Sequence, residues 1–237
     1  MIQDLETWHG MDERTTATWR LPLRKLVIAP WLMDIAHSLG EEAVYQPNGL
    51  DFEKFFMVKP PEERDPASVM MLYHTAMKKG SADGLRALSM VQREVPSLRV
   101  TLFGTPQPPP HLAPWARYYQ CPEQGVLRDL YNASAIFITP SWTEGWGLPP
   151  SEAMMCGAAL AATDTSGHRV YAIPEQTALL SPPKAPEQLA ANILRLIRDG
   201  ALRNRIARNG HEYIQQFTWE KSVSQLESAL FQPVEAS

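Results

Sequence analysis

Apolar residues gather along this chain in short continuous runs. Four runs of five or six residues contain no charged side chain, a pattern typical of strands buried on both faces in parallel sheets that helices cover. A fifth run, LRVTLF from Leu98, alternates apolar and polar residues and predicts a less buried strand. The four continuous runs are LVIAP from Leu26, VMMLY from Val69, AIFITP from Ala135 and ALAAT from Ala159.

Segments with a helical spacing of apolar residues lie between these runs, over residues 84–95, 124–133 and 186–199. The last of them has a proline in its first turn and Gly200 directly after its end, which are usual signals for a helix start and stop. Since right-handed crossover helices connect parallel strands, this order predicts an α/β fold with a doubly wound parallel sheet. Beyond Gly200 the alternation stops, and closing C-terminal helices are expected, the last over residues 219–231.

The segment in front of the main pattern is too short to be a domain of its own. The turn-forming QPNG at residues 46–49 and the proline-rich KPPEERDP that follows predict a domain boundary near Asn48. We therefore expect a partial domain over residues 1–47, a main domain over 48–217, and a closing helix with its tail over 218–237.

Composition and charge exclude several classes of protein. The 237 residues carry 22 Lys and Arg against 26 Asp and Glu, a net charge of −4, whereas nucleic-acid or anionic-membrane binding needs a basic surface. No apolar run approaches the roughly 18 residues of a membrane span, and the N-terminus lacks the pattern of an export signal. Cys121 and Cys156 are too few for a disulfide framework or a zinc site and favour a reducing compartment, so we expect a cytoplasmic protein.

The most informative residues follow the run AIFITP. In an open parallel sheet, ligands bind beyond the carboxyl ends of the strands, next to the first turns of the following helices. Here the strand is followed by SWTEGWGLPPSE, in which Glu144 and Glu152 are separated by seven residues. Gly145 and Gly147 let the backbone approach a ligand, and the two prolines start a helix that runs to about Cys156. The sequence thus predicts backbone amides that face an anion between two carboxylates.

Other interpretations fit the same residues. Glu152, expected in the first turn of that helix, could serve only as a partner of the helix dipole, and the Gly-Trp-Gly loop could be only a tight turn. A glycosidase uses two carboxylates as acid and base, but the sequence does not set the distance between Glu144 and Glu152. These alternatives stay open on the pattern alone.

The run VMMLY is followed by a second candidate segment, HTAMKKG at residues 74–80. Lys79 stands just before a helix start, where a lysine can contact a phosphate beside free amides, although such a lysine is more often only solvated. No GxxxxGK[ST] motif occurs, which disfavours a P-loop nucleotidase. No Asp-x-Asp pair occurs either, which weakens the case for a divalent metal on a diphosphate.

Together these segments resemble a known family. Residues 48–231 are similar to the C-terminal, donor-binding domain of retaining glycosyltransferases of family 4, whose GT-B fold makes that domain Rossmann-like. The most specific element is the pair of glutamates in EGWGLPPSE. The resemblance covers, in collinear order, PNGLD, KKG, LRVTLFG, LYNASAIFITPSWTEGWGLPPSEAMMCG and FTWEKS.

The resemblance implies roles for the residues that match the family motifs. Glu152 would hold the ribose hydroxyls of a nucleotide sugar, Glu144 would lie beside the transferred sugar, and Lys79 would neutralise the departing diphosphate. The backbone that lines the sugar and the distal phosphate would be that of Gly145, Trp146, Gly147 and Leu148, and the backbone that reads the base would be that of Cys121 and Pro122.

The reaction that the resemblance implies is transfer of a sugar from a nucleotide-diphosphate sugar to a hydroxyl of a glycan or lipid-linked acceptor, with retention and without a metal or further cofactor. Polysaccharide biosynthesis, with peripheral attachment at the inner membrane face as an option, is the setting it suggests. One position departs from the family pattern: His74 stands where an arginine usually precedes the lysine by five residues. Leaving-group stabilisation then needs a protonated His74 or another cation, such as Arg169 in SGHR.

The front segment, with QDLETW and LPLRKLVIAPWL, resembles the last third of the N-terminal acceptor domain of the same enzymes. On that interpretation the chain is truncated and lacks most of the acceptor site, and its last helix exposes an apolar patch where it would cross to the missing domain. The alternative to an active enzyme is a donor-binding module that is inactive without that domain or a partner chain.

Overall fold

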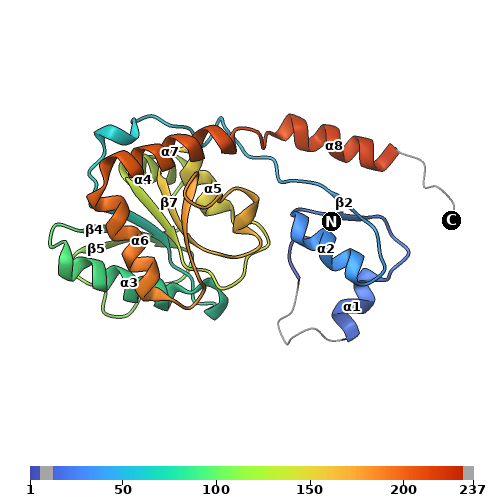
Figure 1. Ribbon diagram of the computed structural model, residues 1–237, viewed down its shortest axis with the longest axis horizontal. Helices are drawn as coiled ribbons and strands as arrows, with labels where there is room; N and C mark the ends of the chain where they lie inside the picture. The colour runs from blue at the N-terminus through green and yellow to red at the C-terminus, as the bar shows by residue number, and fades with distance from the viewer. Residues whose placement is uncertain (6–12, 232–237) are drawn as a thin grey trace. The chain divides into compact units, whose positions relative to one another are not determined.

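The computed structural model describes residues 1–5 and 13–231. They divide into two compact units, one formed by the segment up to Asp51 together with the segment from Gln216 onward, and the other by Phe52–Gln215. The part of QDLETW beyond Leu5 and the tail beyond Phe231, which both figure in the sequence predictions, lie outside the described residues. Figure 1 shows the elements of both units, coloured along the chain.

The sheet of the unit Phe52–Gln215 consists of β3 (Ser68–Leu72), β4 (Arg99–Gly104), β5 (Ala116–Gln120), β6 (Ile136–Thr139), β7 (Ala159–Thr163) and β8 (Ala178–Ser181). Their order across the sheet is β5, β4, β3, β6, β7, β8, and every neighbouring pair is parallel. The chain runs outward from β3 to β5, returns to β6 beside β3, and runs outward again to β8. This is the doubly wound parallel sheet that the sequence predicts.

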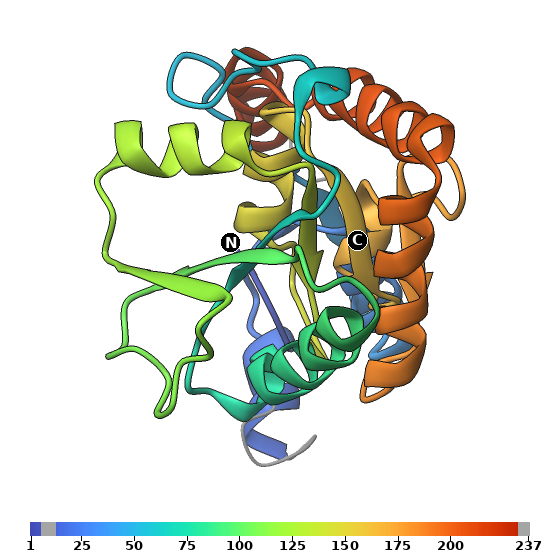
Figure 2. The ribbon, with the colours of Figure 1, turned by 90° about the vertical axis from the view of Figure 1, so that its left-hand side faces the viewer.

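The helices of this unit are α3 (Ser81–Glu94), α4 (Gln124–Ala133), α5 (Leu148–Met155), α6 (Pro186–Arg198) and α7 (Gly200–Ile214). As Figure 2 shows, α3 and α6 pack side by side on one face of the sheet, and α4 and α5 lie on the other. α7 packs against α5, α6 and β7. The core between α3, α6 and the sheet consists of buried aliphatic side chains, among them Leu88, Leu102, Ile138 and Ile193.

Two strands of this sheet are absent from the apolar runs of the sequence. β5 is an edge strand with half-exposed tyrosines, and β8 has only three apolar residues between Thr177 and Ser181, so neither forms a long apolar run. The less buried strand predicted at LRVTLF is confirmed, since Arg99 of β4 is exposed and Thr101 is half-buried between the buried Val100 and Leu102, whereas β6 and β7 are buried along their whole length. β5 covers the outer edge of β4 and thereby encloses it.

The other unit contains α1 (Glu13–Trp19), β1 (Lys25–Val27), α2 (Pro30–Ser38), β2 (Ala43–Tyr45) and α8 (Trp219–Phe231). β1 and β2 pair in parallel, with α2 between them in the sequence. α8 is tied to the segment that follows β2, because the Gln46 side-chain amide donates to the Ser222 carbonyl at 2.7 Å and the Leu50 amide donates to the Phe217 carbonyl at 2.8 Å.

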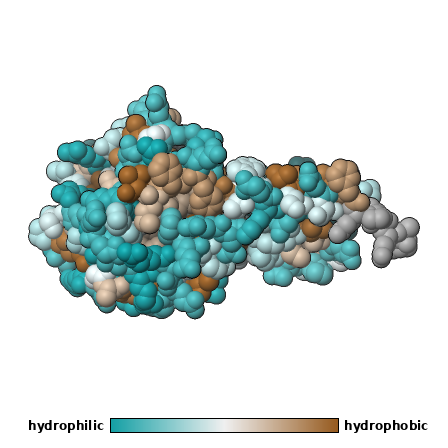
Figure 3. All heavy atoms as spheres, turned by 90° about the horizontal axis from the view of Figure 1, so that it is seen from above, coloured by the Kyte–Doolittle hydropathy of each residue, from teal (hydrophilic) through white to brown (hydrophobic). Residues whose placement is uncertain are grey.

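One face of α8 is apolar and exposed. Trp219, Val223, Leu230 and Phe231 are 55%, 45%, 58% and 84% exposed, in line with the patch that the family resemblance implies. Figure 3 shows brown, apolar side chains beside polar ones on the part of the surface that includes this helix. Within the described ranges, no helix is long and apolar enough to cross a membrane.

A buried arginine joins the C-terminal ends of α4 and α5, which lead into β6 and β7. The side chain of Arg64 is 3% exposed and donates to the carbonyls of Lys59 at 2.6 Å, Ser134 at 2.9 Å and Cys156. The last two carbonyls belong to the C-terminal ends of α4 and α5, where a cation is favourable. Burial lowers the pKa of Arg64 to about 10, so the guanidinium stays charged at neutral pH.

We predict that Arg64→Met lowers the free energy of unfolding by about 3 kcal/mol or more, because several buried carbonyls lose their donor together. Arg208→Met is the control, since Arg208 pairs with Glu62 on the surface, where its side chain is 61% exposed. An exposed pair of this kind contributes about 0–1 kcal/mol. Urea denaturation measures both, and equal losses in the two variants would show that Arg64 does not hold the helix ends.

Candidate functional site

The two candidate segments of the sequence leave the sheet side by side. β3 and β6 are neighbours at the place where the winding of the sheet reverses, and their carboxyl ends point the same way. The loop after β3 contains a 3₁₀ turn, Met77–Lys79, and leads into α3, whereas the loop after β6 leads into α5. Loops that diverge at such a reversal leave a crevice in which doubly wound sheets bind ligands.

Hydrogen bonds join these two loops. The Trp142 amide donates to the Lys78 carbonyl at 2.7 Å, and the Trp142 indole donates to the Asp83 carboxylate at 2.7 Å. Gly80 has a φ of +64°, and a Cβ there would lie 2.0 Å from the carbonyl oxygen of Pro140. Because no side chain fits in that space, the glycine lets the start of α3 lie directly against the end of β6.

Lys79 and Glu144 form an ion pair across the crevice. The Lys79 Nζ lies 2.7 and 2.9 Å from the two carboxylate oxygens of Glu144, and the Ser141 hydroxyl donates to Oε1 at 2.8 Å. The two side chains are 26% and 11% exposed. An ammonium has three N–H donors and this contact uses at most two, so Lys79 keeps one for a ligand. The structure thus brings together two residues that the sequence predicts for the site.

The loop from Gly145 to Leu148 is fixed from below by a tyrosine that the sequence predictions missed. The Tyr171 hydroxyl lies 2.9 and 3.0 Å from the carbonyls of Trp146 and Gly147, and the Trp146 indole donates to the Ser151 hydroxyl at 3.0 Å. Gly147 has a φ of +98°, and a Cβ there would lie 2.7 Å from the Tyr171 hydroxyl. Trp146 is buried and therefore offers its backbone rather than its ring, whereas the Leu148 side chain is 48% exposed.

His168 packs under the same loop and was not among the predicted residues. Its Nδ1 lies 2.8 Å from the carbonyl of Thr163, which can only accept, so the ring proton is assigned to Nδ1. The Nε2 then accepts from the Thr139 hydroxyl at 3.4 Å. Complete burial lowers the pKa of His168, which keeps the ring neutral. A buried ring of this kind gives no pattern along the sequence that would distinguish it from a loop histidine.

Glu152 does not lie in the first turn of its helix, as the sequence analysis expects. α5 begins at Leu148 because Gly147 takes a left-handed conformation, which places Glu152 in the second turn. Its carboxylate accepts a hydrogen bond from the Tyr131 hydroxyl at 2.9 Å. Burial raises the pKa of Glu152, and this hydrogen bond opposes the rise. A role as a mere partner of the helix dipole therefore has no support.

His74 and Arg169, the other two candidate cations, both have hydrogen-bond partners in the structure. The Nδ1 of His74 accepts from the Ala76 amide at 2.8 Å, which assigns the ring proton to Nε2. His74 therefore offers its Nε2–H as a donor at the exit of β3. Arg169 is exposed and pairs with both carboxylate oxygens of Asp164, at 2.5 and 2.6 Å.

Cys121 and Pro122 follow β5 at the far end of the same carboxyl edge. The Cys121 amide donates to the Gly104 carbonyl at 2.9 Å, and its φ is +45°. β4 and β3 separate β5 from β6, a distance of about 14 Å at the usual strand spacing. A ligand that touched Cys121 and Glu144 together would have to be elongated.

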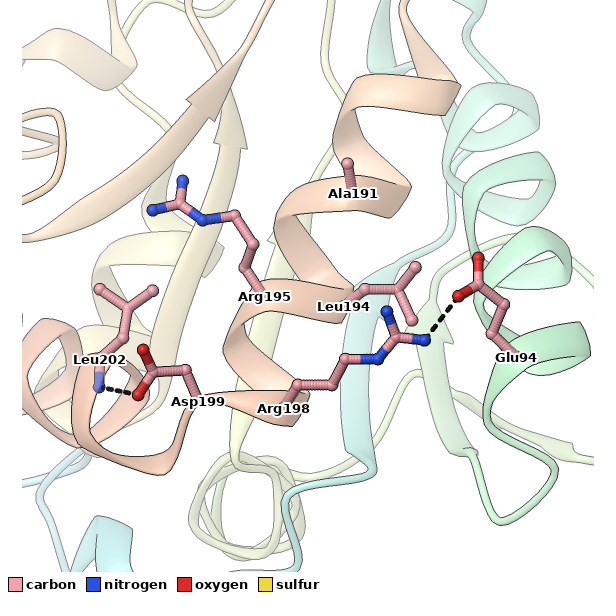
Figure 4. A pocket seen from close by; sticks show the side chains of 7 residues that line it. All are labelled: Glu94, Ala191, Leu194, Arg195, Arg198, Asp199 and Leu202. Carbon is pink, nitrogen blue, oxygen red and sulfur yellow. Dashed lines mark hydrogen bonds and ion pairs between the residues drawn. The ribbon is translucent and has the colours of Figure 1, made fainter.

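The cavity in Figure 4 lies at the opposite end of the sheet. Its volume is about 450 Å³, and it is lined by the last residues of α3 and α6 and the start of α7. Its charges are already paired, because Arg198 contacts Glu94 and Asp199 accepts from the Leu202 amide. At the crevice itself, a small cavity of about 20 Å³ borders Lys79, Ser141 and Glu144, enough for about one water.

Comparison with known proteins identifies the domain. Residues 116–213 match the family described as "Glycosyl transferases group 1". This region is a group 1 glycosyltransferase domain. It includes the loop with Glu144 and Glu152 and all of α4 and α5, and the sheet has the arrangement of a GT-B C-terminal domain.

Curated relatives share this group 1 domain. The chain is 32% identical over 114 residues to O-antigen chain mannosyltransferase B of Escherichia coli. The aligned region covers 47% of this chain and 29% of that protein. It is 29% identical over 101 residues to D-inositol 3-phosphate glycosyltransferase of Streptomyces bingchenggensis, which covers 43% of this chain and 22% of that protein. The chain thus spans less than a third of each of these relatives.

Solved structures share the fold. The C-terminal domain of the group 1 glycosyl transferase LpcC from Francisella tularensis matches with a TM-score of 0.62 and 20% identity, covering 71% of this chain and 97% of that one. HepE from Anabaena, solved in complex with UDP-glucose, matches with a TM-score of 0.81 and 15% identity, covering 97% of this chain and 70% of that one. Both confirm the predicted α/β architecture.

We predict that Gly147→Ala lowers the free energy of unfolding by about 1–3 kcal/mol, because the new methyl group combines a left-handed backbone with a contact on the Tyr171 hydroxyl. Gly125→Ala in α4 is the matched control, since a Cβ there meets nothing within 4 Å. The control is expected to change stability by about 0.5 kcal/mol or less. Denaturant titration compares the two, and an unaffected Gly147→Ala protein would contradict the tight loop described above.

Proposed function

We propose that the group 1 domain binds a nucleotide-diphosphate sugar along the carboxyl edge of its sheet. The base lies toward the backbone of Cys121 and Pro122, the ribose hydroxyls bond to Glu152, and the diphosphate reaches Lys79 and the first amides of α3. The sugar lies against Glu144 and the backbone of residues 145–148. Residues 48–217 form this donor-binding domain, and residues 218–237 form a crossover segment toward an acceptor-side domain of which residues 1–47 are part.

One observation supports the proposal above all: the Lys79–Glu144 pair spans the crevice between β3 and β6. A lysine beside a helix N-terminus suits a diphosphate, and a carboxylate next to it suits a sugar whose anomeric carbon gains positive charge. Glu152 on the neighbouring helix adds an ionised acceptor for hydroxyl groups. UDP-glucose in the HepE structure is of the same ligand class.

We further propose that the complete enzyme transfers the sugar with retention and without a metal. The bond from the anomeric carbon to the diphosphate breaks, and the acceptor hydroxyl bonds to that carbon on the same face while its proton passes to the departing diphosphate. Lys79, the Nε2–H of His74 and the amides of α3 stabilise the growing negative charge. Positioning and electrostatics carry the rate, so no protein nucleophile is required.

The acceptor is a glycan or lipid-linked hydroxyl, and the setting is polysaccharide biosynthesis in the cytoplasm or at the inner membrane face. A mannosyltransferase of O-antigen chains among the relatives supports this class of acceptor. The competing possibility, a donor-binding module that is inactive by itself, differs in one outcome. Residues 1–237 would then bind the nucleotide sugar but transfer nothing until a partner chain or further domain is added.

We predict that Glu152→Ala weakens nucleoside-diphosphate binding about 5-fold to 150-fold, equivalent to about 1–3 kcal/mol for a charged hydrogen bond left without its acceptor. A thermal-shift panel of UDP, GDP, ADP and dTDP sugars first identifies the base, since a ligand at 100 times its Kd stabilises by about 2.7 kcal/mol. Glu212→Ala, an exposed position on α7, is the control. Unchanged affinity in Glu152→Ala would remove Glu152 from the site.

We predict that Lys79→Met lowers the affinity for a nucleoside diphosphate more than the affinity for the matching nucleoside, because Lys79 is assigned to the phosphates alone. The ratio of the two affinities is expected to fall about 10-fold, the size of one charged hydrogen bond. Isothermal titration of both ligands gives the ratio, and Lys221→Met on exposed α8 is the control. A ratio that stays at the wild-type value contradicts the phosphate assignment.

A further inference from the structure

The phenol of Tyr131 reaches the candidate site from within a cluster of aromatic rings. Tyr131 lies in the last turn of α4 and is fully buried. The ring centroids of Phe55, Phe103 and Phe137 lie 5.8, 5.8 and 5.7 Å from its own, with interplanar angles of 74°, 81° and 58°. The packed rings restrict the Tyr131 side chain to one orientation. In that orientation its hydroxyl forms a hydrogen bond with Glu152.

The hydrogen bond between these residues joins two separate crossovers of the fold. The Tyr131 hydroxyl of α4 donates to Oε2 of Glu152 on α5 at 2.9 Å. Among the side chains of residues 1–5 and 13–231, Tyr131 alone bonds to this carboxylate. An ionised carboxylate accepts at both oxygens, so Oε1 remains for a ligand.

The backbone around this pair is held as well. Arg64 donates to the carbonyls of Tyr131 at 3.3 Å and Ser134 at 2.9 Å, and also to that of Cys156 at the end of α5. One guanidinium therefore fixes the ends of both helices that carry the pair. The contact between Tyr131 and Glu152 depends on rigid elements rather than on a loop.

We propose that Tyr131 is a positioning residue for the donor: its hydroxyl holds the Glu152 side chain by Oε2, so that Oε1 is turned to accept the ribose hydroxyls. This inference rests on the proposed function, because the ligand of Glu152 is the ribose of that donor. Tyr131 itself touches the carboxylate and not the donor, so it acts through Glu152. No role for this residue follows from the motif that surrounds it in the sequence.

The site needs such a partner because burial favours the protonated form of Glu152. Burial raises the pKa of Glu152, and the Tyr131 hydrogen bond lowers it again. The other groups near the pair keep one state between pH 5 and 8. The pKa of Tyr131 lies well above its ordinary value, that of Cys156 is raised to about 12, that of Arg64 is lowered to about 10, and Arg128 adds a fixed positive charge.

The test is Tyr131→Phe, which removes the hydroxyl and keeps the ring. The probe is the nucleotide sugar identified by the thermal-shift panel, whose doubly esterified diphosphate does not titrate in this range. We expect its affinity to fall about 3-fold to 10-fold at pH 7.5 and further at pH 5.5, because the pKa of Glu152 rises without the hydrogen bond and the carboxylate is protonated at a higher pH. Isothermal titration at both pH values measures this.

A double-mutant cycle separates positioning from support of the fold. In a Glu152→Gln background, Tyr131→Phe should change affinity less than 2-fold and add no pH dependence, since no ionised carboxylate remains to be positioned. The same loss in both backgrounds would overturn the inference. Should Tyr131→Phe not fold, Phe103→Leu, which removes one wall of the ring cluster, takes its place in the same cycle with an expected loss of about 2-fold to 5-fold.

The outcomes for the inference and for the proposed function are distinct. A wild-type protein that binds none of the nucleotide sugars overturns the proposed function and this inference with it. If the wild-type protein binds one of the nucleotide sugars and Tyr131→Phe binds it with the wild-type affinity at both pH 5.5 and pH 7.5, only the role of Tyr131 is overturned.

Discussion

The candidate site depends on the parallel pairing of β3 with β6. Val69, Met70 and Met71 lie opposite Ile136, Phe137 and Ile138, so two segments that are distant in the sequence end at the same level of the sheet. This register places the 3₁₀ turn with Lys79 next to the loop with Glu144, and their ion pair follows from it. A slip of one residue would turn the side chains of one strand to the opposite face and separate the two loops.

The candidate cations of the proposed diphosphate site have partners in the structure. Lys79 pairs with Glu144, Arg169 pairs with Asp164, and the Nδ1 of His74 accepts from the Ala76 amide. On the proposed function, these pairs leave the cations less charge to attract the phosphates. The remaining sources are the N–H of Lys79 that Glu144 does not use and the amides at the start of α3, which act only at short range. The proposed recognition of a donor then relies on fit more than on long-range attraction.

The sequence predicts the helices better than the sites of contact. Pro186, Gly200 and the spacing of apolar residues locate α6 and α7 closely, because these signals act within one turn of the chain. β5 and β8 are missed, since a half-exposed edge strand and a strand with only three apolar residues lack a long continuous apolar run. The expected place of Glu152 in the first turn is wrong by one turn, because the start of α5 is set by the left-handed Gly147 and not by the prolines.

Within the candidate site, residues in one motif are predicted and their partners are not. Lys79, Glu144 and Glu152 stand out because strand exits are where ligands bind in such sheets. Tyr131, Tyr171 and His168 contact the site only through the packing of separate crossovers, and no spacing rule connects them to it. Only the tertiary contacts show that their hydroxyl and ring nitrogen atoms hold the site residues in place.

The close approach at Gly80 has a consequence for the evolution of this fold. With the Pro140 carbonyl oxygen 2.0 Å from the place of a Cβ, any other amino acid would force the two strand exits apart and break up the crevice. If the proposed donor site is right, a change of donor sugar needs substitutions at positions whose side chains reach solvent, such as Thr143 and the half-exposed Leu148. A mutational library aimed at changed selectivity would vary these exposed positions and keep Gly80 unchanged.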